Sequence, residues 1–173
     1  VKSALEKLHP DKLSPIKKNR VREGHALPNF CVQKEGMIVE WKNMNIDAPP
    51  GNLFGVIEGM GGENGWWGLE YVWYMRGIMD RILGGEGFVS HRSRKHRAEV
   101  GDRMDFLDIE KVIYAEELLL KVRFKLPGQG WMRFKIDSEV HEKSMLSLTV
   151  FFAPKGLRGI AYWYFFLPFH RVI

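Results

Sequence analysis

The second half of the chain shows the alternation of apolar and polar residues that is typical of β-strands. Residues 117–126 carry the clearest pattern, with apolar side chains at every second position from Leu118 and basic side chains on the opposite face at Lys121, Arg123 and Lys125. Similar patterns predict strands over residues 102–112, 131–137 and 145–152, and the segment Pro127-Gly128-Gln129-Gly130 predicts a turn between two of them. Together these patterns indicate an antiparallel meander.

A further strand is predicted earlier in the chain, over residues 36–46. Met37, Val39 and Trp41 share one of its faces, but the alternation shifts by one residue before Met44 and Ile46. A bulge inserts one extra residue into a strand and produces such a shift, so a bulge is expected near residues 42–43.

Two short helices are predicted between this strand and the meander. Pro49-Pro50 resembles a helix start, and the spacing of Leu53, Phe54 and Ile57 places them on one face of a short helix. A second helix is predicted over residues 69–83, with Gly84-Gly85 at its C-terminal end. Its apolar stripe consists of Leu69, Val72, Trp73, Met79, Ile82 and Leu83.

A last helix is predicted over residues 157–170. Its segment 160–169 is entirely apolar or aromatic, which indicates a buried helix, since about 20 residues are needed to cross a bilayer. The order of elements is therefore a strand, two short helices, antiparallel strands and a terminal helix. This order predicts an α+β helix-grip fold, in which a curved antiparallel sheet wraps around a long C-terminal helix, as in START-like and Bet v 1-like domains.

Composition and charge divide the chain into an arm at residues 1–30 and one domain at residues 31–173. Of the net charge of +5, residues 1–25 supply +4, so the domain is nearly neutral and its charge does not predict nucleic-acid binding. The arm, interrupted by Pro10, Pro15 and Pro28, is interpreted as a linker or as a segment docked on the domain. The lone Cys31 and the lack of a visible secretory signal favour a cytoplasmic location.

Several motifs in residues 37–173 resemble an uncharacterised bacterial domain family. They are Gly-Gly-Glu-Asn-Gly-Trp-Trp at 61–67, Trp73, Arg76-Gly77, Asp80-Arg81, Gly84-Gly85-Glu86-Gly87, Gly101-Asp102, Asp105-Phe106, Leu126-Pro127-Gly128, Trp131, Phe152-Ala153-Pro154-Lys155-Gly156-Leu157, Gly159, Tyr162-Trp163-Tyr164 and Pro168-Phe169-His170-Arg171. The resemblance implies a domain that occurs alone or behind an NAD(P)-binding domain similar to short-chain dehydrogenases. No such domain precedes residue 37 here, and the chain, which begins at Val1, is interpreted as a trimmed protein or an excised domain.

Three charged residues are candidates for acid–base chemistry. Arg76 and Asp80 are four residues apart near the apolar stripe of the second helix, where they either present charge to a cavity or form an ordinary surface ion pair. Glu63, beside two tryptophans in a glycine-rich loop, is either an acid–base group with a raised pKa or a brace for the loop. The loop itself matches neither a dinucleotide fingerprint nor a phosphate loop.

Aromatic residues supply the candidates for ligand contacts. The predicted ligand-binding residues are Trp66, Trp67, Trp73, Arg76, Trp131, Tyr162, Tyr164 and His170. Packing in the core and structural hydrogen bonds are the alternative roles for these side chains. The basic segment 91–97 is interpreted as a solvated loop, and the spacing of His, Cys and carboxylate residues predicts neither a metal site nor a cofactor.

Three functions are consistent with these patterns. The leading hypothesis is a cavity that binds a small apolar or amphipathic molecule. The second is a cyclase, isomerase or hydratase that uses Glu63, Arg76, Asp80 or a tyrosine as acid–base groups within one pocket. The third is an interaction domain that docks on a separate dehydrogenase-like protein, which requires an exposed apolar patch.

Overall fold

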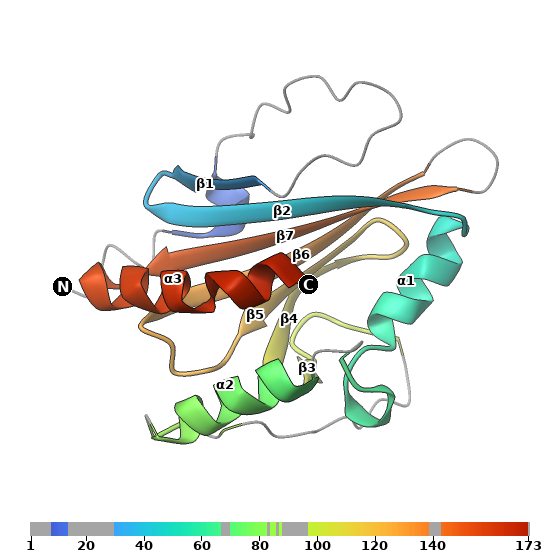
Figure 1. Ribbon diagram of the computed structural model, residues 1–173. Helices are drawn as coiled ribbons and strands as arrows, with labels where there is room; N and C mark the ends of the chain where they lie inside the picture. The colour runs from blue at the N-terminus through green and yellow to red at the C-terminus, as the bar shows by residue number, and fades with distance from the viewer. Residues whose placement is uncertain are drawn as a thin grey trace.

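The computed structural model of the 173-residue chain describes residues 8–13, 30–66, 70–82, 84–85, 87, 97–138 and 143–172. These residues form one antiparallel sheet and three α-helices, the last of them C-terminal (Figure 1). The strands are β1 (Phe30–Lys34), β2 (Met37–Ile46), β3 (Arg103–Met104), β4 (Leu107–Ile113), β5 (Glu117–Val122), β6 (Gly128–Ser138) and β7 (Ser144–Pro154). The helices are α1 (Pro50–Glu58), α2 (Glu70–Ile82) and α3 (Gly156–Val172), with short 3-10 helices η1 (Pro10–Lys12) and η2 (Gly62–Asn64). The α+β class predicted from the sequence is confirmed.

The sheet is open, with the strand order β1-β2-β7-β6-β5-β4-β3. The long strand β7 lies between β2 and β6, so the strand before the first two helices pairs with the strand before the last one. The β2–β7 register runs without interruption from Ile38↔Phe152 to Ile46↔Ser144. These long central strands form the platform on which the helices rest.

All three α-helices pack on one face of this sheet, which we call the helix face. Its apolar side chains include Ile38, Phe152 and Leu120, and the inner faces of α1 and α2 join them in the core. Helix α3 runs across the sheet in front of the central strands (Figure 1). Gly159 allows this close approach, because a Cβ atom there would lie 2.4 Å from the carbonyl oxygen of Pro127 and 2.8 Å from Pro154.

The opposite face, which we call the arm face, is covered by residues 8–13. Leu8 and Leu13 pack against a second apolar cluster made of Met37, Val39, Leu119, Trp131, Phe151 and Ala153. The part of the predicted arm that the structure describes is therefore docked. Residues 1–7 and 14–29, including most of the helical turn expected before Pro10, lie outside the described residues.

The structure corrects three predictions about strands. Strand β1 was not predicted; it joins β2 through a two-residue turn at Glu35 and Gly36, both with positive φ, which is a common hairpin turn. The bulge expected near residues 42–43 is absent from β2, whose shift in pattern reflects polar side chains on the helix face. The strand predicted over residues 102–112 is split, because Asp105 at φ 51° turns the chain between β3 and β4.

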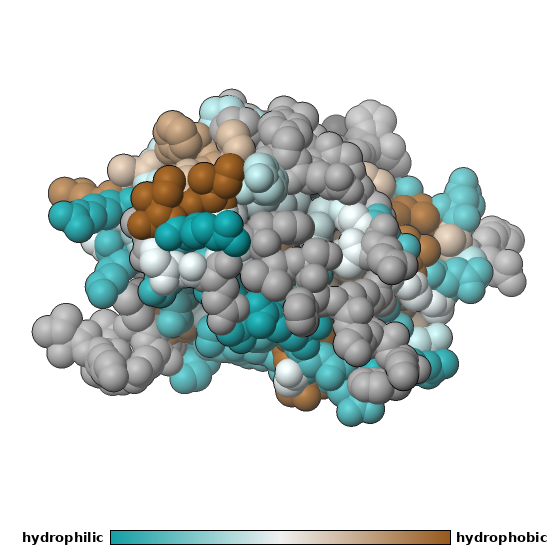
Figure 2. All heavy atoms as spheres, turned by 90° about the horizontal axis from the view of Figure 1, so that it is seen from below, coloured by the Kyte–Doolittle hydropathy of each residue, from teal (hydrophilic) through white to brown (hydrophobic). Residues whose placement is uncertain are grey.

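The outward faces of α2 and α3 remain partly apolar. Leu157 and Phe165 of α3 are 84% and 65% exposed, and Ile78 and Ile82 of α2 are also exposed. Viewed from the side of α2, the surface shows a brown hydrophobic group bordered by teal residues (Figure 2). The burial predicted for the whole of α3 therefore holds only for its inner face, which includes Trp163 and Phe166.

Candidate functional site

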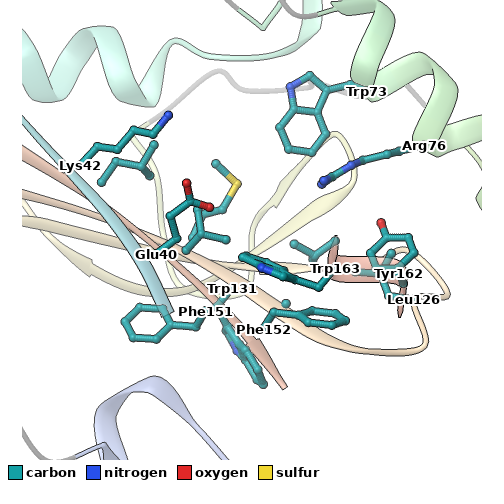
Figure 3. A pocket seen from close by; sticks show the side chains of 15 residues that line it. Glu40, Lys42, Trp73, Arg76, Leu126, Trp131, Phe151, Phe152, Tyr162 and Trp163 are labelled. Atoms are coloured by element: carbon teal, nitrogen blue, oxygen red, sulfur yellow. The ribbon is translucent and has the colours of Figure 1, made fainter. Parts of the chain in front are cut away.

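A pocket of about 80 Å³ lies on the helix face between the sheet, α2 and α3 (Figure 3). Strand residues such as Val150 and Met132 form its floor, while α2 and α3 supply its walls. Its lining consists of Glu40, Lys42, Trp73, Arg76, Val122, Leu126, Gly130, Trp131, Met132, Leu148, Val150, Phe151, Phe152, Tyr162 and Trp163. Most of these residues are apolar, so a bound molecule would mainly meet hydrocarbon surface.

The aromatic wall on α3 is anchored to the sheet by ring contacts. Trp163 stacks on Phe152 with ring centroids 5.5 Å apart and planes 18° apart, and Tyr162 lies 5.8 Å from the same ring. On α2, Trp73 packs on Phe106 at 4.7 Å. Trp73, Tyr162 and Trp163 therefore pack against other rings and also line the pocket.

Arg76 and Tyr162 bring polar groups to the same side of the pocket. The guanidinium carbon of Arg76 lies 4.7 Å from the ring centroid of Phe166 and 5.2 Å from that of Trp73, within cation–π range. Burial lowers the pKa of Arg76, and the nearby Tyr162 opposes this effect. Burial also raises the pKa of Tyr162, whose hydroxyl has no hydrogen-bond partner among the described residues.

Glu40 and Lys42 of β2 face the pocket from the opposite side, and the sequence analysis did not select them. Glu40 is only 4% exposed, and burial lowers the pKa of Lys42 while Glu40 opposes this effect. Figure 3 shows the Glu40 carboxylate and the Arg76 guanidinium pointing toward the pocket from different sides. Strand alternation places Ile38, Glu40 and Lys42 together on one face, opposite the apolar face of the same strand. The sequence therefore contained a signal for their shared position.

Asp80 is not part of this pocket. Its Oδ2 accepts a hydrogen bond from the Gly87 amide at 2.8 Å, and its Oδ1 accepts one from the Lys125 amide. A Cβ atom at Gly85 would lie 2.1 Å from Oδ2, so the carboxylate fits only against a glycine there. Asp80 therefore ties the end of α2 to the chain after β5, and unlike Arg76 it does not line the pocket.

Trp66 has a structural role one layer away from the pocket. Its Nε1 donates a hydrogen bond to Asp105 Oδ2 at 2.9 Å, and the Gly62 amide donates to the same oxygen at 3.0 Å. Trp66 also packs on Trp73, with ring centroids 5.6 Å apart. Asp105 thus holds the glycine-rich loop against the core. The side chain of Glu63 and the whole of Trp67 lie outside the described residues.

The other residues predicted to contact a ligand do not point into the pocket or are not described. Trp131 borders the pocket, but its indole points away from it toward the arm face (Figure 3), where Nε1 donates to Glu110 Oε2 at 2.9 Å. Tyr164 is 63% exposed and does not line the pocket. The reason is helical geometry: Tyr162 and Tyr164 are two positions apart and point in different directions. The side chain of His170 lies outside the described residues.

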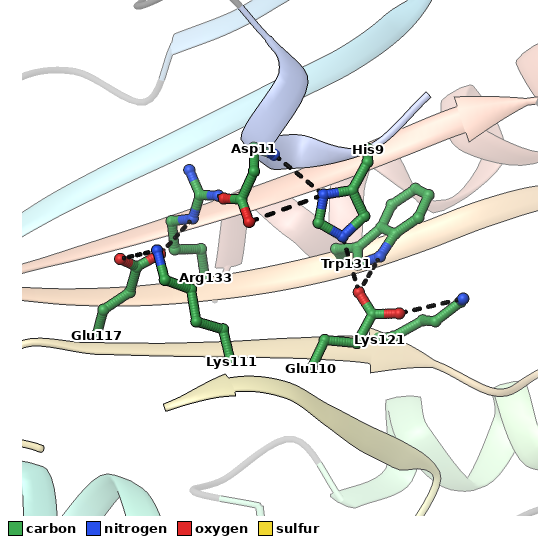
Figure 4. A network of polar contacts seen from close by, with 8 residues as sticks. All are labelled: His9, Asp11, Glu110, Lys111, Glu117, Lys121, Trp131 and Arg133. Atoms are coloured by element: carbon green, nitrogen blue, oxygen red, sulfur yellow. Dashed lines mark hydrogen bonds and ion pairs between the residues drawn. The ribbon is translucent and has the colours of Figure 1, made fainter. Parts of the chain in front are cut away.

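The arm face carries a separate polar network (Figure 4). Glu110 lies at its centre, with His9 Nε2 and Lys121 Nζ each 3.1 Å from one of its carboxylate oxygens. Burial acts to raise the pKa of Glu110, but hydrogen bonds from His9, Lys121 and Trp131 outweigh it, so the pKa is lowered. In a second group, Glu117 pairs with Lys111 at 2.9 Å and with Arg133 at 3.1 Å, and Arg133 also pairs with Asp11. This network fastens residues 8–13 to the sheet.

None of the described helices combines the length and apolar character needed to span a membrane. The described His, Cys, Asp and Glu side chains do not come together in a group of three that would suit a metal ion.

Comparisons with known proteins identify the family. No protein of curated function is similar in sequence to this chain. EF2215, a conserved protein of unknown function from Enterococcus faecalis, has 8% identity over 74% of this chain and 63% of its own, with a TM-score of 0.40. This chain therefore spans less than two thirds of EF2215. CalU16 from Micromonospora echinospora has 10% identity over 75% of this chain and 69% of its own, also with a TM-score of 0.40. The model of the family "protein of unknown function (DUF2867)" matches residues 37–173, and the chain belongs to this family.

Proposed function

We propose that this domain binds a small apolar or amphipathic molecule in the pocket between the helix face, α2 and α3. The observation that carries the proposal is the combination of an apolar floor with charged and hydroxyl groups only at its sides. A few polar groups that fix orientation within apolar walls are characteristic of small-molecule sites. The position of α3 across the sheet also agrees with the helix-grip architecture expected from the order of the elements.

The size of the pocket limits what it holds. A cavity of about 150 Å³ accommodates benzene, so a pocket of about 80 Å³ takes a short alkyl chain or one end of a larger molecule. The pocket is partly open to solvent, which leaves an exit for the rest of such a molecule. A ligand that is partly inserted and partly exposed is amphipathic in the sense proposed here.

A filling substitution tests the proposal. We expect Val150→Phe to occupy the pocket and to abolish binding, because Val150 lies in its floor. The matched control is Val100→Phe, which adds the same group at a position that is 66% exposed and outside the pocket. Native mass spectrometry would detect a molecule retained during purification, and saturation-transfer NMR would detect short primary alcohols and carboxylates. The proposal fails if no molecule is retained and none of these probes binds to the wild-type protein.

The two other hypotheses have less support. Catalysis by the predicted acid–base set required two of its members in one pocket; Arg76 and Tyr162 meet there, but Asp80 is held by two main-chain amides elsewhere. Both Arg76 and Tyr162 retain their protons at neutral pH, which suits holding an oxygen more than abstracting a proton. The interaction hypothesis required an exposed apolar patch. Leu157 and Phe165 of α3 and Ile82 of α2 are exposed apolar side chains, while a joint patch and the partner itself both stay predictions.

A further inference from the structure

We propose that the ligand of this pocket is a monoanion, namely an apolar molecule with a single carboxylate, bound at the side formed by Arg76 and Tyr162. This inference rests on the proposed function, since it specifies the chemistry of the molecule that the pocket holds. The two side chains come from different helices, α2 and α3, and both line the pocket. They therefore supply two donors to one place on its wall.

Arg76 is suited to a carboxylate because of how it is held. Two aromatic rings, those of Phe166 and Trp73, lie within 4.7 and 5.2 Å of the guanidinium carbon and fix its position. The N–H donors of a guanidinium lie in its plane and match the two oxygens of a carboxylate. In Figure 3 the guanidinium points from α2 toward the pocket. Burial lowers the pKa of Arg76, and a nearby negative charge would stabilise the charged form of its side chain.

Tyr162 provides the second donor. Its hydroxyl is buried without a hydrogen-bond partner among the described residues, and an unsatisfied buried hydroxyl is costly. Burial raises the pKa of Tyr162, so the hydroxyl keeps its proton at neutral pH and can donate a hydrogen bond. Both side chains line the pocket, and Figure 3 shows them on the same side of it, so one ligand group placed there would face both donors.

The charges around the pocket favour a single negative charge. Its lining contains two cations, Lys42 and Arg76, and one carboxylate, Glu40, which leaves a net charge of +1. One carboxylate on the ligand would neutralise this charge. A second carboxylate at the far end of the ligand would meet Glu40, so a dicarboxylate is disfavoured.

The experiment compares carboxylates with primary alcohols of the same chain length, from four to about eight carbons. We expect the wild-type protein to bind each carboxylate at least about tenfold more tightly than the matched alcohol, measured by calorimetry or by NMR titration. Arg76→Gln is expected to remove this preference, so that the carboxylate and the matched alcohol bind with similar affinity. Tyr162→Phe is expected to weaken carboxylate binding several-fold, and a dicarboxylate of the same length should bind more weakly than the monocarboxylate.

The control is Arg158→Gln, which removes one positive charge from the exposed part of α3 and should leave the preference intact. Circular dichroism would verify that each variant is folded. Equal binding of alcohol and carboxylate to the wild type, or a preference that survives in Arg76→Gln, would overturn the anion assignment and leave the proposed pocket in place. If no probe of either kind binds, the proposed function fails together with this inference.

Discussion

The two faces of the sheet use charged residues in different ways. On the arm face, Glu110 and Glu117 lie within 3.1 Å of the basic side chains that surround them, and Leu8 and Leu13 cover an apolar cluster on the same face. On the helix face, Glu40 and Arg76 point toward a pocket from different sides across an apolar floor. The first arrangement joins charged side chains directly to one another, while in the second the charged side chains line a pocket.

This difference distinguishes charged side chains that stabilise the fold from charged side chains that face a pocket. Charged groups that contact several partners contribute to folding, and their removal leaves those partners unsatisfied. A buried charge beside a pocket makes folding less favourable, because it has lost water, and such a cost is common at binding sites. The comparison therefore predicts a large loss of stability for substitutions on the arm face and only a small change at Arg76 beside the pocket.

The largest effect is expected for Trp131→Ala on the arm face. Trp131 is 1% exposed, packs in the apolar cluster and donates to Glu110. Loss of this side chain should lower the free energy of unfolding by about 3–5 kcal/mol. Urea denaturation followed by fluorescence or circular dichroism would measure it. A loss below about 1 kcal/mol would mean that the arm face does not stabilise the domain.

Next in size is the contrast between Asp80→Ala and Arg76→Gln, four residues apart on α2. Asp80→Ala leaves the amides of Gly87 and Lys125 without their acceptor and should cost about 2–4 kcal/mol. Arg76→Gln removes a desolvated cation and should change stability by less than about 1 kcal/mol, in either direction. Both values come from the same denaturation measurement. An equally large loss for Arg76→Gln would assign Arg76 a structural role.

Much of the fold followed from the sequence because it depends on local patterns. Alternation in residues 117–126 placed Leu118 and Leu120 on the buried side, and the spacing in α1 placed Phe54 and Ile57 there. Leu119 is also buried, on the arm face, because residues 8–13 cover that side of the sheet. No pattern within the strand predicts a cover that comes from a hundred residues away, so this burial was missed.

The pocket was only partly predictable for a similar reason. Trp73, Arg76 and Tyr162 were selected from helical spacing, and they line the pocket. Trp131 was selected because it is a large ring in a strand, but the direction of its side chain depends on the register of β6. Glu40 was overlooked because a charged residue between apolar neighbours resembles the solvent side of a strand until the helices are placed on it.

A smaller effect concerns the pH dependence of the arm face. The pKa of Glu110 lies below its ordinary value of 4.5 in the folded protein, so its ionised form adds stability above about that pH. This stability should be lost as the pH falls through the folded pKa. Thermal unfolding between pH 7 and pH 3 would show a decrease in Tm that is shallower in Glu110→Gln, which starts from a lower Tm at pH 7. Parallel curves for the two proteins would show that the ionisation of Glu110 does not contribute to the stability of the domain.

The smallest effect is expected for an ion pair that belongs to neither face. Lys143 and Asp47 approach to 2.9 Å, the same distance as Lys111 and Glu117, but their side chains are 52% and 83% exposed. Water and salt screen such a pair, so Lys143→Ala should change the free energy of unfolding by less than about 0.5 kcal/mol. Lys111→Ala is the matched control and should cost more, since Glu117 is 13% exposed and is shared with Arg133. Equal losses in denaturation at moderate salt would mean that distance alone sets the strength of these pairs, and the contrast drawn between the two faces would then lose its physical basis.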